Sequence, residues 1–461
     1  MNPERRDSAA APEPVIAAIA TALGGAVAIV RVSGRDAPAV ATRLWQGSPP
    51  LPELPPRTLT LGRVCDRDGQ PLDRVLAVRF PGGASYTGEP MVEFHAHGGP
   101  AGARAILEAL YVAGARPAAP GEFTRRAFLN GRLDLTQAEA VADLIAANSR
   151  LALKQAEIHL EGRFGRLVRN LHRETGRLAA ETEARLDFPE EPLSLATPAA
   201  LAEDCRRLAE DCLALAGRQR WGDLLRHGAT VVLAGPPNAG KSSLLNALLG
   251  RDRALVTPVP GTTRDTIEEL AEIRGLPVWL VDTAGLRHTE EPVELAGIAR
   301  ARAHLAGAAV ILWIMDATQP LAAQHPDAGA EWDGRRLLPV LNKCDLASPT
   351  LPLPWPAAYP PVTISVLTGA GLEALEEAVA GLLTAGNAAA GDLPAPNQRQ
   401  AALLERAAAA LRDAASRLAS ESWETAAVAL RDAAAQLGRI LGLTHTPDLL
   451  DTIFSRFCIG K

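Results

Sequence analysis

A glycine-rich loop between an apolar run and a helical run constrains this chain more than any other feature. Residues 235–242 read Gly-Pro-Pro-Asn-Ala-Gly-Lys-Ser, which is the G-x-x-x-x-G-K-S spacing of a P-loop. The apolar run 229–234 precedes it and the apolar-periodic run 244–249 follows. Glycines let successive backbone N–H groups turn toward phosphate oxygens, and the helix start adds a partial positive charge. The order strand, loop, helix therefore predicts a nucleotide-binding domain, in which Lys241 would reach the β- and γ-phosphates and Ser242 would bind Mg²⁺.

Two further motifs follow in the order that a GTPase needs. Residues 261–265 (Gly-Thr-Thr-Arg-Asp) lie in a loop rich in proline and glycine. A threonine there can offer its hydroxyl to Mg²⁺ and its backbone N–H to the γ-phosphate. The apolar run 277–281 ends in residues 282–285, Asp-Thr-Ala-Gly. Asp282 would hold Mg²⁺ through water, and Gly285 gives the backbone freedom to contact the γ-phosphate and to switch.

Two more motifs point to guanine. Residues 342–345, Asn-Lys-Cys-Asp, follow the apolar run 338–341. Asp345 can accept both N1–H and N2–H of guanine, which adenine cannot supply, and Lys343 can lie along the base plane. The segment 364–369 offers a backbone N–H to guanine O6. An ATPase is the competing interpretation, and five motifs in order, each at a strand end, favour a guanine nucleotide.

The sequence indicates the catalytic group less directly than it indicates the nucleotide. Leu286 follows Gly285, and an apolar side chain cannot orient water as the glutamine of Ras-like proteins does. Asn238 and the loop 257–263 offer oxygens for a monovalent cation at the place of an arginine finger. Glu294 is a candidate to position water, and the alternative is a solvated glutamate on a helix face.

Length, charge and cysteine content limit the classes of protein to which this chain can belong. At 461 residues the chain is expected to form two or three domains. Its net charge of −6 argues against wholesale coating of nucleic acid. Five scattered cysteines without C-x-x-C spacing indicate neither a disulfide framework nor a zinc site, as in a reducing cytosol. No apolar run reaches the roughly 18 residues of a membrane helix, and the segment before Pro14 lacks a signal-peptide core. A cytoplasmic protein is expected.

The region before the helices reads as mixed α/β. Strands are expected at 27–32, 57–64, 74–80 and 91–94, and a helix at 101–114. His95 and His97 would share one face of a strand. A metal pair is one interpretation, and a hydrogen-bonded structural or pocket role is favoured because no third ligand has convincing spacing.

Helical patterns flank the nucleotide-binding region on both sides. The first begins with a capping box of Thr136 and Glu139 and runs to about Leu186, and a second covers 198–227. After a Pro/Gly linker at 391–397, helices are expected at 400–419, 421–441 and 447–457, the last capped by Thr446. The nucleotide-binding domain would therefore be inserted into a helical domain, because insertions succeed at surface loops.

Further motifs give the chain a full-length resemblance. They are Asp282-Thr-Ala-Gly-Leu-Arg287, Arg126-Ala-Phe-Leu-Asn-Gly-Arg-Leu-Asp-Leu-Thr-Gln-Ala-Glu-Ala140, Asp187-Phe-Pro-Glu-Glu191 and the terminal Cys458-Ile-Gly-Lys461, beside the P-loop and Gly261-Thr-Thr-Arg-Asp265. Together they cover the chain end to end, and the chain resembles the bacterial tRNA modification GTPases of the MnmE (TrmE) family.

This resemblance implies a multidomain fold, α/β plus all-α. An N-terminal α+β tetrahydrofolate-binding and dimerisation domain would span residues 1–133, and an inserted Ras-like G domain would span 228–384. The two parts of a discontinuous helical domain would span 134–227 and 385–461. It also implies a homodimer whose G domains pair in a K⁺-dependent way. With the flavoprotein MnmG, which would carry FAD, a heterotetramer would add an aminomethyl or carboxymethylaminomethyl group to C5 of the tRNA wobble uridine, with folate as one-carbon donor.

The resemblance also assigns roles to residues of this chain. Glu294 would be catalytic, and Cys458 matches a cysteine often proposed as functional. K⁺ would be held by Asn238, Thr257, Val259 and Thr262, Mg²⁺ by Ser242 and Thr263, and the folate by Arg31, Glu93, Arg132 and Lys461. GTP would contact Asn238, Ala239, Gly240, Lys241, Ser242, Ser243, Thr257, Pro258, Val259, Pro260, Gly261, Thr262, Thr263, Asp282, Thr283, Ala284, Gly285, Asn342, Lys343, Asp345, Ser365, Val366 and Leu367.

Two residues depart from the family pattern, and two other functions compete with tRNA modification. Arg132 stands where many relatives have lysine, and a guanidinium fork is not equivalent to an ammonium. Val366 stands where relatives usually have alanine. A regulatory GTPase of ribosome assembly needs neither Cys458 nor a folate-like domain. A folate-dependent one-carbon transferase with a regulatory G domain differs only in which protein carries the methylene chemistry. No G-x-G-x-x-G follows a strand, so flavin would come with the partner.

Overall fold

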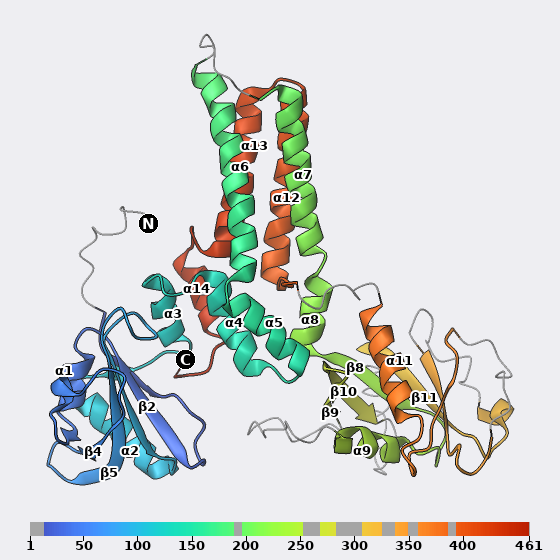
Figure 1. Cartoon of the computed structure of the whole chain (residues 1–461), viewed down its shortest axis with the longest axis horizontal. Helices are drawn as coiled ribbons and strands as arrows, with labels where there is room; N and C mark the ends of the chain where they lie inside the picture. The colour runs from blue at the N-terminus through green and yellow to red at the C-terminus, as the bar shows by residue number, and fades with distance from the viewer. Residues whose placement is uncertain are drawn as a thin grey trace, which may run out of the picture. The chain divides into compact units, whose positions relative to one another are not determined.

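The computed structural model describes residues 13–188, 196–251, 268–282, 307–324, 337–348, 358–385 and 393–460 (Figure 1). The chain forms two compact units. The first consists of residues 1–142, 160–172 and 437–461, and the second of residues 143–159 and 173–436.

The first unit is built on a sheet of seven strands. The strands are β1 (Ile16–Ile19), β2 (Val27–Ser33), β3 (Trp45–Gln46), β4 (Thr60–Cys65), β5 (Pro71–Phe80), β6 (Met91–His97) and β7 (Arg116–Pro117). Their order is β3-β4-β5-β6-β2-β1-β7, and all neighbours are antiparallel except β1 and β7. The strands expected at 27–32, 57–64, 74–80 and 91–94 are confirmed as β2, β4, β5 and β6. β4 starts later than expected, at Thr60, and β6 extends to His97.

Side chains alternate across this sheet and so divide it into two faces. Helices α1 (Ala37–Thr42) and α2 (Pro100–Val112) pack on the core face, where Val30, Phe94 and Ile106 are fully buried. Leu61 and Leu76 lie opposite each other on the other face and remain exposed. The helix expected at 101–114 is confirmed.

The first helical region is divided more finely than its sequence pattern indicates. Four helices follow the sheet: α3 (Glu122–Leu129), α4 (Leu135–Ala146), α5 (Arg150–Leu160) and α6 (Arg163–Asp187). Gly162, with φ of 74°, supplies the left-handed residue between α5 and α6. The capping box expected at Thr136 and Glu139 is wrong. Asp134 Oδ1 instead accepts from the Gln137 N–H (3.0 Å), and Gln137 Oε1 accepts from the Asp134 N–H (3.0 Å), because α4 already begins at Leu135.

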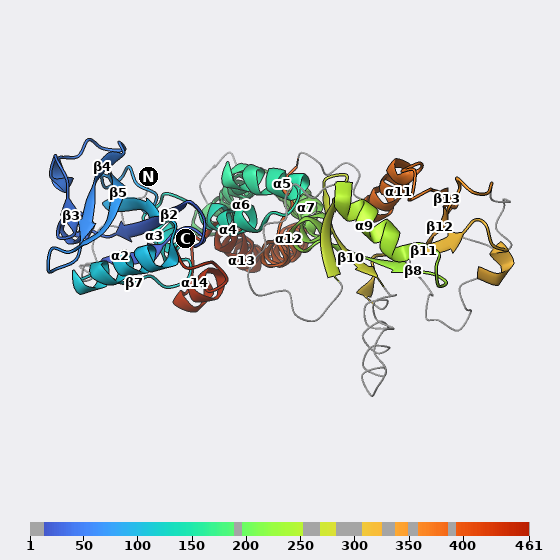
Figure 2. The ribbon, with the colours of Figure 1, turned by 90° about the horizontal axis from the view of Figure 1, so that it is seen from below.

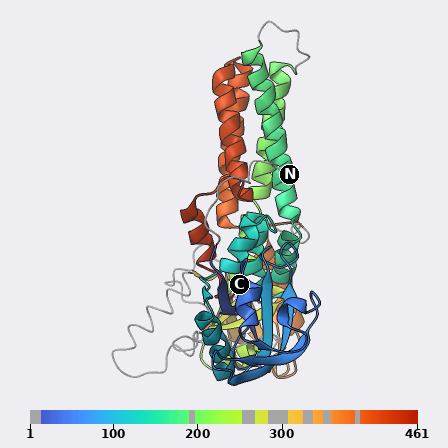
Figure 3. The same cartoon turned by 90° about the vertical axis from the view of Figure 1, so that its left-hand side faces the viewer.

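Helices from the two flanks of the chain pack together in the second unit. α7 (Pro198–Ala216) lies along α12 (Gln398–Ala419), beside α6 and α13 (Trp423–Leu441), as Figure 3 shows. The Arg185 guanidinium lies 4.9 Å from the centre of the Trp423 ring. Cys205 and Cys212 on α7 are fully buried, and burial raises the pKa of both thiols to about 12. This core position agrees with their spacing of seven residues.

The last helix belongs to the first unit. α14 (Pro447–Phe454) is capped by Thr446, whose hydroxyl accepts from the Leu449 N–H at 3.3 Å, as expected. Phe454 and Phe457 pack with Phe128 and Leu135 in one apolar cluster. The end of the chain is thereby fixed beside α3.

The nucleotide-binding region is a mostly parallel sheet in the second unit. Its strands are β8 (Ala229–Ala234), β9 (Glu268–Ile273), β10 (Leu276–Asp282), β11 (Val310–Asp316), β12 (Leu337–Asn342) and β13 (Val362–Thr363), in the order β13-β12-β11-β8-β10-β9. Only β9 is antiparallel to its neighbour. Helices α9 (Lys241–Arg251) and α11 (Leu372–Thr384) pack on one face (Figure 2). α8 (Gln219–His227) leads into β8.

The order of these strands locates a ligand site. From β8 the chain goes to β10 on one side and to β11 on the other, so the strand order reverses beside β8. Ligands of open α/β sheets bind at the carboxyl ends of the strands at such a reversal. The P-loop, the end of β10 and the end of β12 all lie at this edge. A multidomain fold of α/β and all-α parts is confirmed.

Within the described ranges, no helix combines the length and the apolar character that crossing a membrane requires.

Candidate nucleotide-binding site

The P-loop has a backbone that its glycines make possible. Gly235 has φ of 142° and Gly240 has φ of 99°. A side chain at Gly235 would clash with the Ile314 carbonyl, and one at Gly240 would clash with the Asn342 amide. Asn238 also adopts a left-handed φ of 62°, which asparagine tolerates better than most residues. The loop therefore follows the compact path that a phosphate cradle requires.

Lys241 and Ser242 begin α9 and point into this loop region. Lys241 is buried, and its Nζ donates to the carbonyls of Gly235 (3.0 Å) and Pro236 (2.8 Å). The Ser242 hydroxyl donates to Asp282 Oδ2 at 2.6 Å. Asp282 is the last residue of β10 and is 3% exposed. The two oxygens expected to surround Mg²⁺, one bound directly and one through water, are thus adjacent, and hard oxygen donors suit this ion.

Asn342 connects the phosphate side of the site to the base side. Its Nδ2 donates to the Ala239 carbonyl at 2.9 Å, and its Oδ1 accepts from the Val366 N–H at 3.1 Å. The Cys344 N–H donates to the Ile364 carbonyl at 3.1 Å. Because Val366 contributes a backbone group here, a valine in place of alanine leaves this contact intact.

Groups expected to read guanine lie beside Asn342. Asp345 is exposed, and no hydrogen bond to it is found within the part of the chain that the structure describes. Ser365 is buried, and its hydroxyl accepts from the Thr368 N–H at 3.2 Å, while Leu367 is 86% exposed. The strand before this segment is shorter than expected, since β13 ends at Thr363. The structure therefore brings Lys241, Ser242, Asp282, Asn342, Lys343, Asp345, Ser365 and Val366 to one edge of the sheet.

The other expected contacts lie outside the described residues. They are Thr257, Pro258, Val259, Pro260, Gly261, Thr262, Thr263, Thr283, Ala284, Gly285 and Glu294. Of the four expected K⁺ ligands, only Asn238 is described.

A second cluster lies in the first unit, on β2 and β6. Arg31 Nε donates to Glu93 Oε1 at 2.8 Å, and Arg31 Nη1 donates to the Gly460 carbonyl at 3.3 Å. The guanidinium also lies 5.7 Å from the centre of the Tyr86 ring and 5.6 Å from that of Phe123. Two of the four expected folate residues and the end of the chain are thus together.

The other folate candidates are less closely tied to this cluster. Arg132 Nη1 donates to the Gly83 carbonyl at 3.1 Å. Cys458 is exposed, and its carbonyl accepts from the Gly121 N–H at 3.4 Å. Lys461 lies outside the described residues.

The two histidines of β6 contact different carboxylates. His95 Nε2 lies 3.2 Å from Glu93 Oε2, and His97 Nδ1 lies 2.7 Å from Asp73 Oδ1. The hydrogen-bonded role expected for them is confirmed. His95 is also a neighbour of the candidate folate site that its sequence position alone did not reveal.

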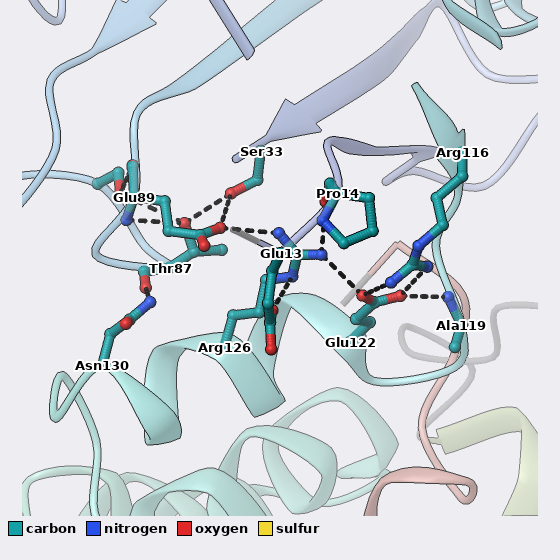
Figure 4. Close-up of polar contacts among 11 residues, drawn as sticks. Glu13, Pro14, Ser33, Thr87, Glu89, Arg116, Ala119, Glu122, Arg126 and Asn130 are labelled. Atoms are coloured by element: carbon teal, nitrogen blue, oxygen red, sulfur yellow. Dashed lines mark hydrogen bonds and ion pairs between the residues drawn. The ribbon is translucent and has the colours of Figure 1, made fainter. Parts of the chain in front are cut away.

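A buried ionic network that the sequence did not reveal lies at α3 (Figure 4). Arg126 is 1% exposed, and it donates to Glu89 Oε2 (3.0 Å), Glu122 Oε1 (2.9 Å) and the Pro14 carbonyl (2.8 Å). Arg116 also pairs with Glu122. Burial alone would raise the pKa of Glu122, and the hydrogen bonds from Arg116 and Arg126 lower it below its ordinary value. The network attaches α3 to the sheet and so positions Phe123 against Arg31.

The fold and the site define a class of protein. A P-loop follows the central strand of a mostly parallel sheet, Ser242 meets Asp282 beside it, and an Asn-Lys-x-Asp loop follows a neighbouring strand. These are the parts of a P-loop GTPase.

Comparison with known proteins identifies the family within this class. The MnmE helical domain matches residues 135–458, and the N-terminus of the GTP-binding protein TrmE matches residues 15–132. The chain belongs to the tRNA modification GTPase MnmE family. It is therefore a GTP hydrolase of tRNA modification, with GTP and Mg²⁺ as the nucleotide and metal of its class.

The relatives match over nearly their whole length. The tRNA modification GTPase MnmE of Symbiobacterium thermophilum is 44% identical over 97% of this chain and 100% of its own. That of Alkalilimnicola ehrlichii is 44% identical over 97% and 99%, and that of Akkermansia muciniphila is 42% identical over 98% and 99%. Among solved structures, the FeoB G-domain from Methanococcus jannaschii is 27% identical over 34% of this chain, with a TM-score of 0.27 that adds nothing to this assignment.

Proposed function

We propose that the chain, together with the flavoprotein MnmG, uses K⁺-activated GTP hydrolysis to modify C5 of the wobble uridine of certain tRNAs. The modification is an aminomethyl or carboxymethylaminomethyl group, and a tetrahydrofolate derivative donates the one-carbon unit. The observation that carries the GTPase part is the placement of Lys241 and the Ser242–Asp282 pair at the carboxyl ends of β8 and β10. The setting proposed for this reaction is the cytoplasm, with tRNA as substrate of the complex.

The proposed chemistry divides among residues of this chain. Lys241 leaves its carbonyl partners for the β- and γ-phosphates, whose charge attracts an ammonium more strongly than a neutral carbonyl does. Ser242 and Thr263 ligate Mg²⁺, which neutralises charge on the phosphate oxygens when bound. Asp282 would help to hold this metal, and Glu294 would orient the attacking water.

A monovalent cation would take the place of an arginine finger. The left-handed backbone of Asn238 supports this proposal, because such a conformation turns successive backbone groups to form a concave ion-binding surface. Thr257, Val259 and Thr262 would complete the ligand set. K⁺ beside the γ-phosphate would stabilise the charge that develops in the transition state.

The first prediction concerns the cation. Initial rates of GTP hydrolysis measured in K⁺ are expected to exceed those in Na⁺ at equal ionic strength by about tenfold or more. Glu294→Ala should lose about a hundredfold in kcat in K⁺, since it removes the group that positions water. Glu291→Ala, a neighbouring glutamate, serves as the matched control. Equal rates in the two salts would refute the cation site and leave only a generic GTPase.

The candidate folate site in the first unit supports the one-carbon part. Arg31, partly buried beside Glu93, offers a guanidinium to a glutamyl carboxylate or a pterin ring, and the partly exposed Tyr86 provides aromatic surface next to it. Arg132 and Lys461 are proposed as further contacts. Cys458 is proposed to act near this site, which its exposure and its place two residues from Gly460 support.

An exposed apolar face supports the proposed homodimer. Leu61 and Leu76 are 51% and 39% exposed and lie opposite each other on the face of the first sheet that α2 does not cover. Contiguous exposed apolar side chains of this kind mark interaction surfaces. A second copy of the chain is the proposed occupant.

The second prediction tests this dimer. Leu61→Asp should convert the dimer to a monomer in the absence of nucleotide, because it places a charge in an apolar interface at a cost of several kcal/mol. Light scattering coupled to size exclusion gives the mass directly. Val112→Asp, also on an exposed apolar residue of the first unit, is the control and should remain dimeric. A monomeric wild-type protein at micromolar concentration would contradict the proposal.

A further inference from the structure

An ion pair joins the base-reading loop to the neighbouring strand. Lys343 follows β12, and its Nζ lies 2.6 Å from Oδ2 of Asp316, the last residue of β11. β11 and β12 are parallel, with Asp316 opposite Asn342. Asp316 therefore lies beside the Asn-Lys-x-Asp loop although it is 27 positions away in sequence.

Asp316 is itself held from several directions. Its Oδ1 accepts from both the N–H (2.9 Å) and the hydroxyl (2.6 Å) of Thr318. The Gln324 side chain binds both backbone groups of Asp316. Its Oε1 accepts from the Asp316 N–H at 2.8 Å, and its Nε2 donates to the Asp316 carbonyl at 2.9 Å. Burial alone would raise the pKa of Asp316, and the hydrogen bonds from Lys343 and Thr318 lower it below its ordinary value. The carboxylate is thus ionised at neutral pH and fixed in place.

Lys343 needs such a partner. Its backbone has a left-handed φ of 66°, which costs a non-glycine residue free energy and persists when the surroundings require it. A lysine side chain has about 2 kcal/mol of rotamer entropy to lose when it is held in one conformation. To lie flat along a purine ring, its four methylene groups must be extended in a single direction. An anchor at the ammonium end fixes that direction before the nucleotide arrives.

We propose that Asp316 is a positioning residue for guanine-nucleotide binding, which holds Lys343 by its ammonium so that the lysine stem forms one wall of the base site. The inference rests on the assignment of Lys343 to the base. Thr318 supports it by fixing the second oxygen of the carboxylate.

A purely structural role for the pair is the competing explanation. β11 and β12 are already paired in register from Ile311 to Asp316, and the Ala317 N–H donates to the Asn342 carbonyl at 2.9 Å. Lys343 is also 32% exposed at its side chain, and ion pairs with such exposure contribute little to stability. The pair therefore adds little to the strand pairing, whereas it determines where the lysine points.

The third prediction tests this role through nucleotide affinity. Asp316→Asn is expected to weaken the binding of a fluorescent GDP analogue by about tenfold, because the neutral amide holds the ammonium poorly. Thr318→Val should weaken it by about two- to fourfold, since it removes one hydrogen bond to the carboxylate. The KM for GTP should rise while kcat changes little. GTP and ITP should lose affinity equally, because the lysine stem contacts the ring and not the 2-amino group.

Lys343→Met separates the two explanations. If Asp316 acts through Lys343, the double variant Asp316→Asn with Lys343→Met binds GDP within twofold of Lys343→Met alone. Losses that multiply in the double variant would overturn the inference, as would an Asp316→Asn protein that binds like wild type. If Asp316→Asn does not fold, an unchanged affinity of Thr318→Val decides against it. An unchanged affinity of Lys343→Met would instead refute the assignment of Lys343 to the base.

Discussion

Replacing Asp345 with asparagine is expected to weaken GTP binding by at least about a hundredfold and to make xanthosine triphosphate the preferred nucleotide. In the proposed complex the carboxylate would accept hydrogen bonds from N1–H and N2–H of guanine, and bonds to a charged group contribute about 1.5–3 kcal/mol each. An asparagine amide would accept from N1–H but meet the guanine 2-amino group with its own N–H donors. Xanthine presents a carbonyl at that place, and the amide can donate to it.

The exposed position of Asp345 makes this variant a clean test. Its side chain supports no other group among the described residues, so folding should be unaffected. Calorimetric titration with GDP and XDP measures the exchange of preference. Glu373→Gln, an exposed acid on α11 that pairs with Arg274, is the control and should retain guanine preference. Retained preference for GDP in Asp345→Asn would place the base elsewhere.

Replacing Lys241 with methionine is expected to lower kcat for GTP hydrolysis by about a thousandfold. The side chain is 7% exposed, and its ammonium is held against the carbonyls of Gly235 and Pro236, at the start of the loop that is proposed to bind phosphate. Removing one preorganised positive group from a site where transition-state charge develops costs about a hundredfold to a thousandfold. Methionine keeps the length and apolar stem, so the helix should remain intact.

Steady-state hydrolysis under saturating GTP and Mg²⁺ measures this loss. Lys154→Met removes an exposed lysine on α5 and should leave the rate unchanged. A Lys241→Met protein that hydrolyses GTP within tenfold of wild type would show that the ammonium is not part of the catalytic site.

Short-range patterns predicted much of the nucleotide site. The strand Ala229–Ala234 is confirmed residue for residue, because the apolar run and the glycine loop that ends it are contiguous in sequence. The ends of β10 and β12 were predicted in the same way, because a polar motif follows each apolar run. Asp282 and Asn342 then meet the P-loop because carboxyl ends of parallel strands share one edge of a sheet.

Features that depend on strand register or on charge burial were missed. β9 reads Glu-Glu-Leu-Ala-Glu-Ile and lacks the clean alternation of a strand, since Glu272 turns inward to accept from the Arg150 N–H (2.9 Å) and Nε (2.8 Å). Arg126 looks like a solvated charge in sequence and is among the most buried side chains. The role proposed for Asp316 depends on the pairing of β11 with β12, which brings its carboxylate beside Lys343.

One measurement tests the central claim, that GTP hydrolysis by this chain drives tRNA modification. In a bacterial strain that lacks its own copy of the gene, nucleosides from total tRNA are analysed by mass spectrometry after the chain is supplied. We expect wild type and Lys154→Met to restore the C5-modified wobble uridine, and Lys241→Met to leave the uridine unmodified. Full restoration by Lys241→Met, or active hydrolysis by the wild type without any change in the uridine, would contradict the account, and the second result would favour a regulatory GTPase.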